Sequence, residues 1–533
     1  MTAGFLVLGV AEAWSDSPTF DEPVYVSSAV AVLLHHDVTL NEEHPPLTKV
    51  LAVLPVLLTH PVVPGNGTWS GNDEYSYGAR FLAAQLAAGK LRRVTFASRL
   101  VPLAETAGVT FVLYAIGSEL SGAVAGMLAG LLWLASPFVL GIGHLDGTDV
   151  PFALGAALSS WALLRWLRWR DTRRLAWLGL ALASAAETQV TGLMVVASGL
   201  AVVVAAQWRS GIVRALTQAA VAALIVWAAV WVVYLVLDPA MVRQLPLIVP
   251  RPYLDGIRYL SVHDGSGSAA YIAGVAYTGG RWWYWPLSLV IKWPEAGLLL
   301  LVAGAFGCLW LPRDLRRRAG VAVGVPAVLL TGFTLTMPKD VGLRYLLPVL
   351  ALWAAAAGSG LAAAGSRVVA AGMGRLAWAV TSVLLVAALV STAVSFPDSI
   401  AWTAWPFRPN YTMVTDSNVD WGQDLYVLRS WSASRDPWVA YFGPRGISTA
   451  DIPGARPLLG TAPRHVTGWA AVSVTAINSA NRSALSWLRG WCPVAVLAGS
   501  ILIYHFSRSP SASSAPASSR PAALCPGQWS SAR

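Results

Sequence analysis

Eleven apolar runs limit what this chain can fold into more than any other feature. The first occupies about residues 1–13, and ten further runs have about 20 residues or slightly fewer. A helix needs roughly 20 apolar residues to cross ~30 Å of hydrocarbon. The ten runs lie near residues 99–117, 121–141, 151–169, 175–188, 190–207, 213–237, 286–311, 320–337, 341–363 and 375–396. The sequence therefore predicts an all-α polytopic membrane protein with about 11 transmembrane helices.

The composition agrees with this class of protein. Of the 533 residues, 56% are hydrophobic and only 12% are charged, far more apolar than an average soluble domain. The net charge of +10 comes from basic residues in short clusters between apolar runs, a pattern that orients membrane proteins. We therefore expect no nucleic-acid partner. Three cysteines without C-x-x-C spacing support neither a zinc ribbon nor redox chemistry.

The arginine clusters predict which loops face the cytoplasm. The clusters at 165–174, 207–214, 313–318 and 366–375 fall on one face if the N-terminus is cytoplasmic. We expect a multi-pass plasma-membrane protein with five outer segments: a long first loop (14–97), a short loop (144–149), a loop at 238–285, a turn at 338–344 and the region from 397. The first run is short and lacks a preceding basic residue, and a cleaved signal peptide is the rival interpretation.

Three domains follow from this topology. Residues 1–396 form a transmembrane module, residues 397–506 form a small α+β domain outside the membrane, and the Ser-, Ala- and Pro-rich residues 507–533 form a disordered tail. The apolar stretch 494–506 is too short to span and is rich in strand formers. It predicts a buried strand of the outer domain.

The polar residues that suggest chemistry gather in or beside the outer segments. They are Asp21, Glu22, Glu42, Glu43, His44, His144, Asp146, Asp149, His263, Asp264, Lys339, Asp340 and Arg344. A proton-coupled transporter more often buries its carboxylates at mid-helix between inverted repeats, and no repeat pair is visible here. The placement favours an enzyme that works at the outer membrane surface, with a transporter or a glycolipid-binding scaffold as alternatives.

Each acidic motif also has a purely structural interpretation. In FDEPVY (20–25), Asp21 suits a helix N-cap and the following proline suits a first turn. In NEEHPPLTKV (41–50), a charge cluster favoured by a helix dipole is sufficient. In GHLDGTDVPF (143–152), His144, Asp146 and Asp149 have ligand types for a divalent cation, but Asp149 equally suits an N-cap.

Basic residues lie at the predicted outer surface as well, against the topological bias. They are Arg251, Arg258, Lys292, Lys339 and Arg344. A cation there suits the phosphate of a lipid carrier, which arginine grips with its planar fork and lysine as a point charge. Anchoring in the headgroup region is the structural alternative. The aromatic block GGRWWYWPLSLVIKWP (279–294) marks an interface or lines a sugar or lipid groove.

Taken in order, these motifs resemble one family. FDEPVY, EEHPPLTK, GHLDGTDVPF, GGRWWYWPLSLVIKWP, GLRYLLP and DSNVDWGQDL (416–425) are similar to motifs of bacterial phospholipid-carrier-dependent glycosyltransferases. That group, glycosyltransferase family 39, is related to the protein O-mannosyltransferases and to the aminoarabinose transferase of lipid A. The resemblance covers about residues 1–505 and implies a GT-C fold with juxtamembrane helices in the first outer loop.

The resemblance also implies a reaction and its residues. A sugar, mannose-like or another hexose or pentose, would move from a polyprenyl-phosphate carrier to an acceptor hydroxyl on a protein, glycan or lipid, with inversion. Asp21 would be the general base, and Glu22 would orient the acceptor or shape the local electric field. Asp149 would bind acceptor, sugar or a cation, together with Asp146, His144 and Glu43. Arg344 and Lys292 would bind the carrier phosphate.

The sequence departs from the family in the first outer loop. In the aminoarabinose transferase a lysine directly precedes the proline pair and is thought to meet the carrier phosphate. Here His44 occupies that place. Phosphate contact by this loop would need a protonated His44 or a contribution from Lys49. No cofactor is certain from the sequence, and a divalent cation stays open.

Overall fold

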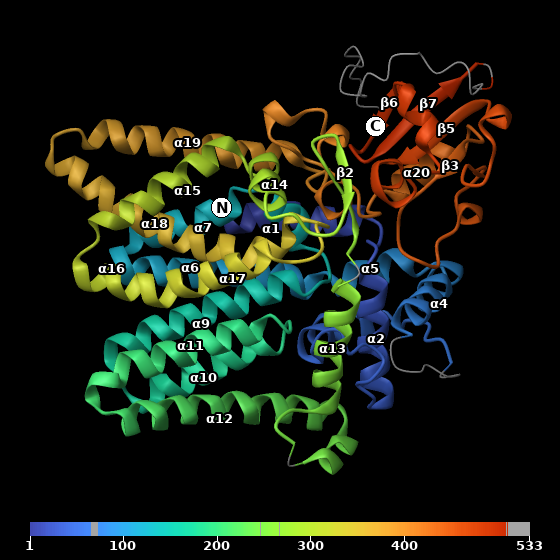
Figure 1. Cartoon of the computed structure of the whole chain (residues 1–533). Coiled ribbons are helices and arrows are strands. Elements are labelled where there is room, and N and C mark those ends of the chain that lie inside the picture. Colours follow the sequence, from blue (N-terminus) through green and yellow to red (C-terminus); the bar gives the residue numbers. More distant parts are fainter. Residues whose placement is uncertain (66–72, 246, 266, 508, 510–533) are drawn as a thin grey trace.

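Long helices make up most of the structure, as the apolar runs predict. Figure 1 shows the computed structural model, which describes residues 1–65, 73–245, 247–265, 267–507 and 509. Seven of the described helical segments are long and apolar enough to span a membrane. They are α5–α6 (Leu91–Ser98 and Leu100–Ser121), α9 (Asp149–Trp169), α11 (Gly192–Gln207), α12 (Ile212–Leu237), α16–α17 (Arg313–Ala319 and Val325–Leu335), α18 (Leu347–Ala370) and α19 (Gly374–Ser395).

Two bent helix pairs bring the number of candidate spans to as many as nine in the described residues. They are α7–α8 (Ala123–Leu134 and Pro137–Gly143), bent by 71°, and α14–α15 (Tyr284–Lys292 and Glu295–Gly307), bent by 120°. A proline stands at each break, at Pro137 and Pro294, and it removes a helical hydrogen bond there. The two other predicted spans coincide with α1 (Thr2–Ser15) and α10 (Thr172–Ala186), which have 14 and 15 residues. The count of eleven stays a prediction.

Helix α18 lies at the centre of the bundle. Its span is 83% buried, whereas the span of α19 is only 17% buried, and α18 packs against α6, α7, α9 and α15. Small residues permit this close packing, because a Cβ added to Gly358 would lie 2.4 Å from the backbone nitrogen of Ala129. The start of α18 is therefore held in a fixed position.

The predicted first outer loop contains helices that cross one end of the bundle (Figure 1). They are α2 (Glu22–His35), α3 (Pro46–Leu57) and α4 (Glu74–Ala87). Helix α2 packs between α3 and α4, and its first eleven residues are buried. The juxtamembrane helices that the resemblance implies are thus present as helices.

The predicted outer loop 238–285 is also ordered. It forms α13 (Arg251–Gly265) and a hairpin of strands β1 (Ala269–Ile272) and β2 (Val275–Thr278). Both residues of the hairpin turn, Ala273 and Gly274, have positive φ, which is the backbone that a two-residue hairpin turn prefers. This hairpin lies beside the C-terminal region through a bridge between Ile272 and Val414.

The C-terminal region contains a mixed five-stranded sheet in the order β4-β3-β5-β7-β6. Its strands are β3 (Trp438–Ala440), β4 (Arg456–Pro457), β5 (Gly468–Ser473), β6 (Ala495–Leu497) and β7 (Ile501–Phe506), and it is joined by helix α20 (Leu425–Ser432). One face packs on α20 and the other joins the main core. The stretch 494–506, expected as one strand, forms the β6–β7 hairpin. The predicted tail at 507–533 lies almost entirely outside the described residues.

The helix ends that carry the arginine clusters lie at one end of the bundle, opposite α2 and α13 (Figure 1). This arrangement leads to a labelling prediction. A cysteine at the exposed Ser434 should react with a membrane-impermeant maleimide in intact cells. A cysteine at the exposed Arg317 of α16 should react only after permeabilisation. The reverse pattern, measured above the background of the parent chain, would overturn the orientation.

Candidate active site

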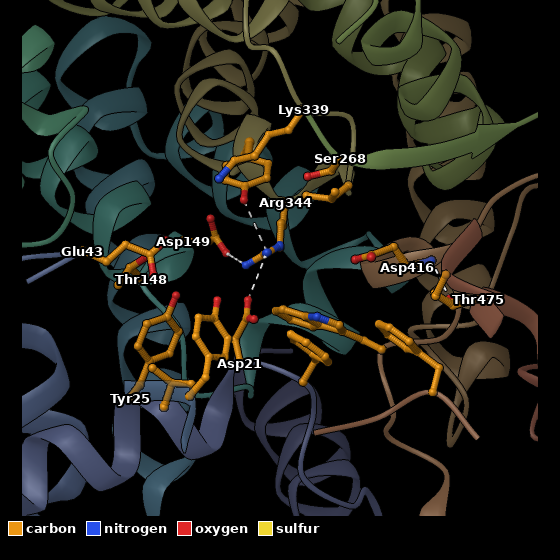
Figure 2. A pocket seen from close by; sticks show the side chains of 18 of the residues that line it. Asp21, Tyr25, Glu43, Thr148, Asp149, Ser268, Lys339, Arg344, Asp416 and Thr475 are labelled. Carbon is orange, nitrogen blue, oxygen red and sulfur yellow. Dashed lines mark hydrogen bonds and ion pairs between the residues drawn. The ribbon is translucent and has the colours of Figure 1, made fainter. Parts of the chain in front are cut away.

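Two carboxylates meet one arginine at the end of the bundle where α2 begins. Arg344 Nη1 lies 3.1 Å from Asp149 Oδ2, and Arg344 Nη2 lies 3.2 Å from Asp21 Oδ2 (Figure 2). Asp21 precedes α2, Asp149 begins α9, and Arg344 lies in a 3-10 turn just before α18. A planar guanidinium donates on two sides. One arginine therefore joins three segments that are far apart in the sequence.

Asp21 has the position of a helix cap but not its hydrogen bond. It precedes α2 at the N-cap, yet its side chain accepts no capping hydrogen bond. The Asp21 side chain is 17% exposed, against 5% for Asp149. Burial raises the pKa of Asp21 above its ordinary value, while Arg344 and Lys339 oppose that rise. Asp21 thus presents a carboxylate of enhanced basicity to the space in front of it.

That space is a cavity of about 280 Å³. Its wall combines acidic, basic, hydroxyl and aromatic side chains from the first outer loop, α9, the turn before α18 and the C-terminal region. The lining residues are Phe20, Asp21, Val24, Tyr25, Glu43, His44, Tyr75, Thr148, Asp149, Gln189, Ser268, Ala269, Lys339, Val341, Arg344, Tyr345, Asp416, Trp421, Phe442, Thr475, Ser479 and Ala480. A cavity of this size and composition can bind a small ligand and orient it through a few polar groups.

Residues 416–425, which we call the clamp segment, fix the turn that carries the central guanidinium. The Ser417 hydroxyl donates to the carbonyl of Val341 at 2.7 Å, and the amide N–H of Leu343 donates to Asn418 Oδ1 at 2.9 Å. These contacts hold the backbone on the N-terminal side of the arginine. The sequence predicts no chemistry for this motif, and these two contacts show that it positions the turn before α18.

The clamp segment also holds the loop that carries the first carboxylate. The N–H of Phe20 donates to the carbonyl of Trp421 at 3.0 Å, and the N–H of Ser17 donates to the carbonyl of Gln423 at 2.8 Å. The guanidinium carbon of Arg344 lies 4.2 Å from the centroid of the Trp421 ring, which is a favourable cation–π contact. The segment therefore fixes the position of Arg344 relative to the loop that carries Asp21.

Glu22 lies outside this cavity, although it is adjacent to Asp21 in the sequence. Its side chain is 2% exposed and accepts two 2.7 Å hydrogen bonds from Arg99. It also accepts from the backbone N–H groups of Thr19 and Asp146. Burial opposes its ionisation, but Arg99 and these donors outweigh burial and lower the pKa of Glu22. The expected role in orienting an acceptor is not supported by any contact with the cavity.

The residues of the predicted cation site point to different partners. His144 Nε2 lies 3.2 Å from Asp16 Oδ2, Asp146 is buried beside Glu22, and only Asp149 reaches the cavity. Across the residues that the structure describes, no group of three or more His, Cys, Asp or Glu side chains is arranged to hold a metal ion. The three residues do not form a common ligand set.

The first outer loop contributes Glu43 and His44 to the cavity wall. Burial raises the pKa of Glu43 to about 7. Burial and the nearby charges of Lys49 and Lys339 hold the pKa of His44 well below its ordinary value. His44 is thus neutral, and it can offer a phosphate one hydrogen bond but no positive charge.

Lys49 and Lys292, which the sequence makes candidates for phosphate binding, lie away from the cavity. Lys49 Nζ donates to the side chain and carbonyl of Asn41 and to the carbonyl of His44. Lys292 is fully buried and donates to the carbonyls of Ile400 and Trp402. Neither lines the cavity. Of Arg344 and Lys292, the two residues expected to bind the carrier phosphate, only Arg344 lines the cavity.

Part of the chain that forms this cavity matches a known protein family. Residues 83–234 match the model of a family described as dolichyl-phosphate-mannose-protein mannosyltransferase. This match confirms the predicted resemblance over these residues. The mannosyltransferase-family match contains Arg99, Asp149 and Gln189, and Gln189 donates to Thr148 Oγ1 at 2.7 Å and to Asp149 Oδ1 at 3.3 Å. It therefore covers the α9 wall of the cavity.

The solved structures that this chain matches are distant from it in sequence. ArnT from Cupriavidus metallidurans in the apo state is 13% identical, with a TM-score of 0.47 over 94% of this chain and 96% of that chain. ArnT bound to undecaprenyl phosphate is 16% identical, with a TM-score of 0.42 over 75% and 70%. AglB from Archaeoglobus fulgidus, an oligosaccharyltransferase in complex with an inhibitory peptide and a dolichol-phosphate, is 12% identical, with a TM-score of 0.44 over 92% and 72%. The comparison with curated proteins gives no match.

A second, more apolar cavity adjoins the first and was not expected from the mannosyltransferase-like motifs. It has a volume of about 360 Å³ and lies between α13, α17 and the start of α18. Four residues line both cavities: His44, Gln189, Lys339 and Tyr345. The sequence alone identifies Lys339 only as one of several basic residues in or beside the predicted outer segments. Its position in the same short turn as Arg344 was the available signal.

Proposed function

We propose that the protein is a membrane glycosyltransferase whose active site faces the extracytoplasmic side of the membrane. It transfers a sugar from a polyprenyl-phosphate carrier to an acceptor hydroxyl, with inversion at the anomeric carbon. The observation that carries this proposal is the bridge of Asp21, Arg344 and Asp149 in a polar cavity that adjoins an apolar one. The mannosyltransferase-family match over residues 83–234 supports the same class of donor.

In this mechanism, Asp21 takes the proton of the acceptor hydroxyl as the oxygen attacks the anomeric carbon. The bond between that carbon and the phosphate oxygen breaks, and the phosphate leaves with the electron pair. Arg344 and Lys339 face the developing negative charge, so they stabilise the transition state more than the bound donor. Asp149, oriented by Gln189, keeps the guanidinium in the plane that reaches Asp21.

The carrier has a place of its own in this proposal. The apolar cavity is lined by aliphatic and aromatic residues that include Phe152, Ile257, Leu260, Leu330 and Phe333. An isoprenoid chain is apolar and would bury its surface there. The phosphate would then lie at the wall that both cavities share, beside Lys339, Gln189 and Tyr345.

Mass spectrometry of the cell envelope tests the proposed reaction whichever sugar is transferred. Glycans, glycoproteins and glycolipids are compared between cells with the chain, without it, and with Asp21→Asn. We expect one glycosylated species to require the chain and the Asp21 carboxylate. If the envelope profiles are identical while a lipid-linked sugar accumulates on one side of the membrane, the protein is a transporter instead.

The pH profile of transfer gives a separate prediction. A base works only when it is ionised, so the rate should fall as the pH drops through the pKa of Asp21. Because burial raises that pKa, the midpoint should lie above ~4, the ordinary value of an aspartate. Glu43, with a pKa of about 7 in the same cavity, is tested with Glu43→Gln, which should keep the acid limb. A rate that is constant down to pH 4 would contradict the assignment.

A further inference from the structure

One wall of the polar cavity is not used by the proposed mechanism. It comes from the C-terminal region and carries Asp416, Thr475, Ser479 and Phe442. Figure 2 shows the Asp416 carboxylate turned toward the centre of the cavity, on the side of Arg344 opposite Asp149 and Glu43. The four residues that the polar cavity shares with the apolar one, His44, Gln189, Lys339 and Tyr345, all lie outside this C-terminal wall. An acceptor that attacks in line, away from the leaving phosphate, would therefore meet the Asp416 wall.

The backbone of Asp416 is held in an unfavourable conformation by specific contacts. Its φ is +56°, a left-handed value that aspartate tolerates better than most residues. Its N–H donates to Thr475 Oγ1 at 2.8 Å, and its Oδ1 accepts from the N–H of Ser417 at 2.7 Å. Among the described residues, no hydrogen bond to its other carboxylate oxygen is found. A strained residue so fixed, with acceptor capacity aimed into a cavity, is typical of a ligand site.

The rest of this wall has the composition of a carbohydrate site. The rings of Phe20 and Phe442 stack at 5.3 Å with planes only 3° apart, and Trp421 lies beside them in the lining. Flat aromatic faces carry partial negative charge and attract the C–H groups of a sugar ring. Among the described lining residues, the lysine and arginine side chains are Lys339 and Arg344, which the leaving phosphate already occupies. The wall therefore suits a neutral, hydroxyl-rich acceptor rather than an anionic one.

We propose that Asp416 accepts hydrogen bonds from hydroxyl groups of a carbohydrate acceptor and so places one of its hydroxyls in front of Asp21. This inference rests on the proposed transfer reaction and specifies its acceptor class. A carboxylate can accept from two neighbouring hydroxyls at once, which a sugar ring supplies and a serine or threonine side chain does not. Burial raises the pKa of Asp416 to about 7, a cost that a bound pair of donors would offset.

The test uses the purified full chain and two matched variants. Asp416→Asn keeps a side chain that tolerates the left-handed backbone and can still accept from Ser417. Asp436→Asn is the control, because Asp436 is exposed in the same region, also has positive φ (+46°) and lines neither cavity. Saturation-transfer NMR is recorded with methyl glycosides of mannose, glucose, galactose and arabinose, and with a blocked Ala-Thr-Ala peptide. Binding of undecaprenyl phosphate is measured on the same samples.

We expect at least one methyl glycoside to bind the parent chain and Asp436→Asn, and Asp416→Asn to weaken that affinity by about tenfold or more. The affinity for undecaprenyl phosphate should be equal in all three proteins. Unchanged glycoside affinity in Asp416→Asn, or binding of the peptide without any glycoside, would overturn the acceptor assignment. Failure of the parent chain to bind undecaprenyl phosphate would instead count against the proposed transfer reaction, whatever the glycosides do.

Discussion

Replacement of Asp21 by asparagine is expected to lower kcat for sugar transfer by about 10²- to 10⁴-fold, the range for loss of a general base. Asparagine has nearly the same shape and can still accept a hydrogen bond from Arg344, so the melting temperature should stay close to that of the parent chain. The side chain is partly exposed and caps no helix N–H, which removes the usual structural reasons for a large loss of stability.

The measurement is transfer in membranes together with thermal unfolding of the purified chain. Asp436→Asn is the control, because it makes the same change from carboxylate to amide at an exposed residue that lines neither cavity. Transfer at the parent rate by Asp21→Asn would remove Asp21 from the mechanism. A loss of transfer together with a large fall in melting temperature would assign Asp21 a structural role instead.

Replacement of the adjacent Glu22 by alanine is expected to lower the stability of the fold, whereas the change at Asp21 affects catalysis. It should destabilise the fold by about 3–5 kcal/mol, because it leaves the buried guanidinium of Arg99 without its charged partner. Arg99 is fully buried and also donates to the carbonyls of Ala13, Asp16 and Ser17. These contacts tie α1 to α6, so loss of the pair loosens the first outer loop as a whole.

Thermal unfolding in detergent micelles measures this effect, and Glu42→Ala, whose carboxylate is only half-buried, is the control. The pH dependence has a defined sign. The pKa of Glu22 is lowered in the folded chain. Its contribution to folding stability is therefore present at a pH above the pKa of the unfolded chain, and it is lost as the pH falls through the pKa of the folded chain. A stable Glu22→Ala variant that binds undecaprenyl phosphate but no longer transfers sugar would instead give Glu22 a catalytic role.

These opposite roles show where sequence-based prediction ends. The apolar runs and arginine clusters predict the helices because a membrane imposes a length and a charge rule on local sequence. Adjacent carboxylates have no such rule. Whether Asp21 or Glu22 faces the cavity depends on two arginines that lie far away in the chain. Arg99 binds Glu22, and Arg344 binds Asp21.

The same limit explains the cations. Lys292 and Lys49 have the right charge and lie in or beside predicted outer segments, but their Nζ atoms already donate hydrogen bonds to backbone carbonyls. Lys339 reaches both cavities because the turn before α18 is held by the clamp segment at 416–425. A contact between residues so far apart leaves no periodic signal in the sequence. The sequence of residues 416–425 identifies a specific motif, but only the structure shows that this segment holds the turn before α18.

Donor turnover tests the central claim most directly. Purified chain in nanodiscs is incubated with undecaprenyl-phosphate sugars of defined anomeric configuration and with cell-envelope acceptor, and NMR follows the products. We predict that one donor releases undecaprenyl phosphate and glycosylates the acceptor in equal amounts, with inverted configuration. A chain that is folded and binds undecaprenyl phosphate, but releases it from none of the sugars or retains the configuration, would contradict an inverting transferase with Asp21 as its base.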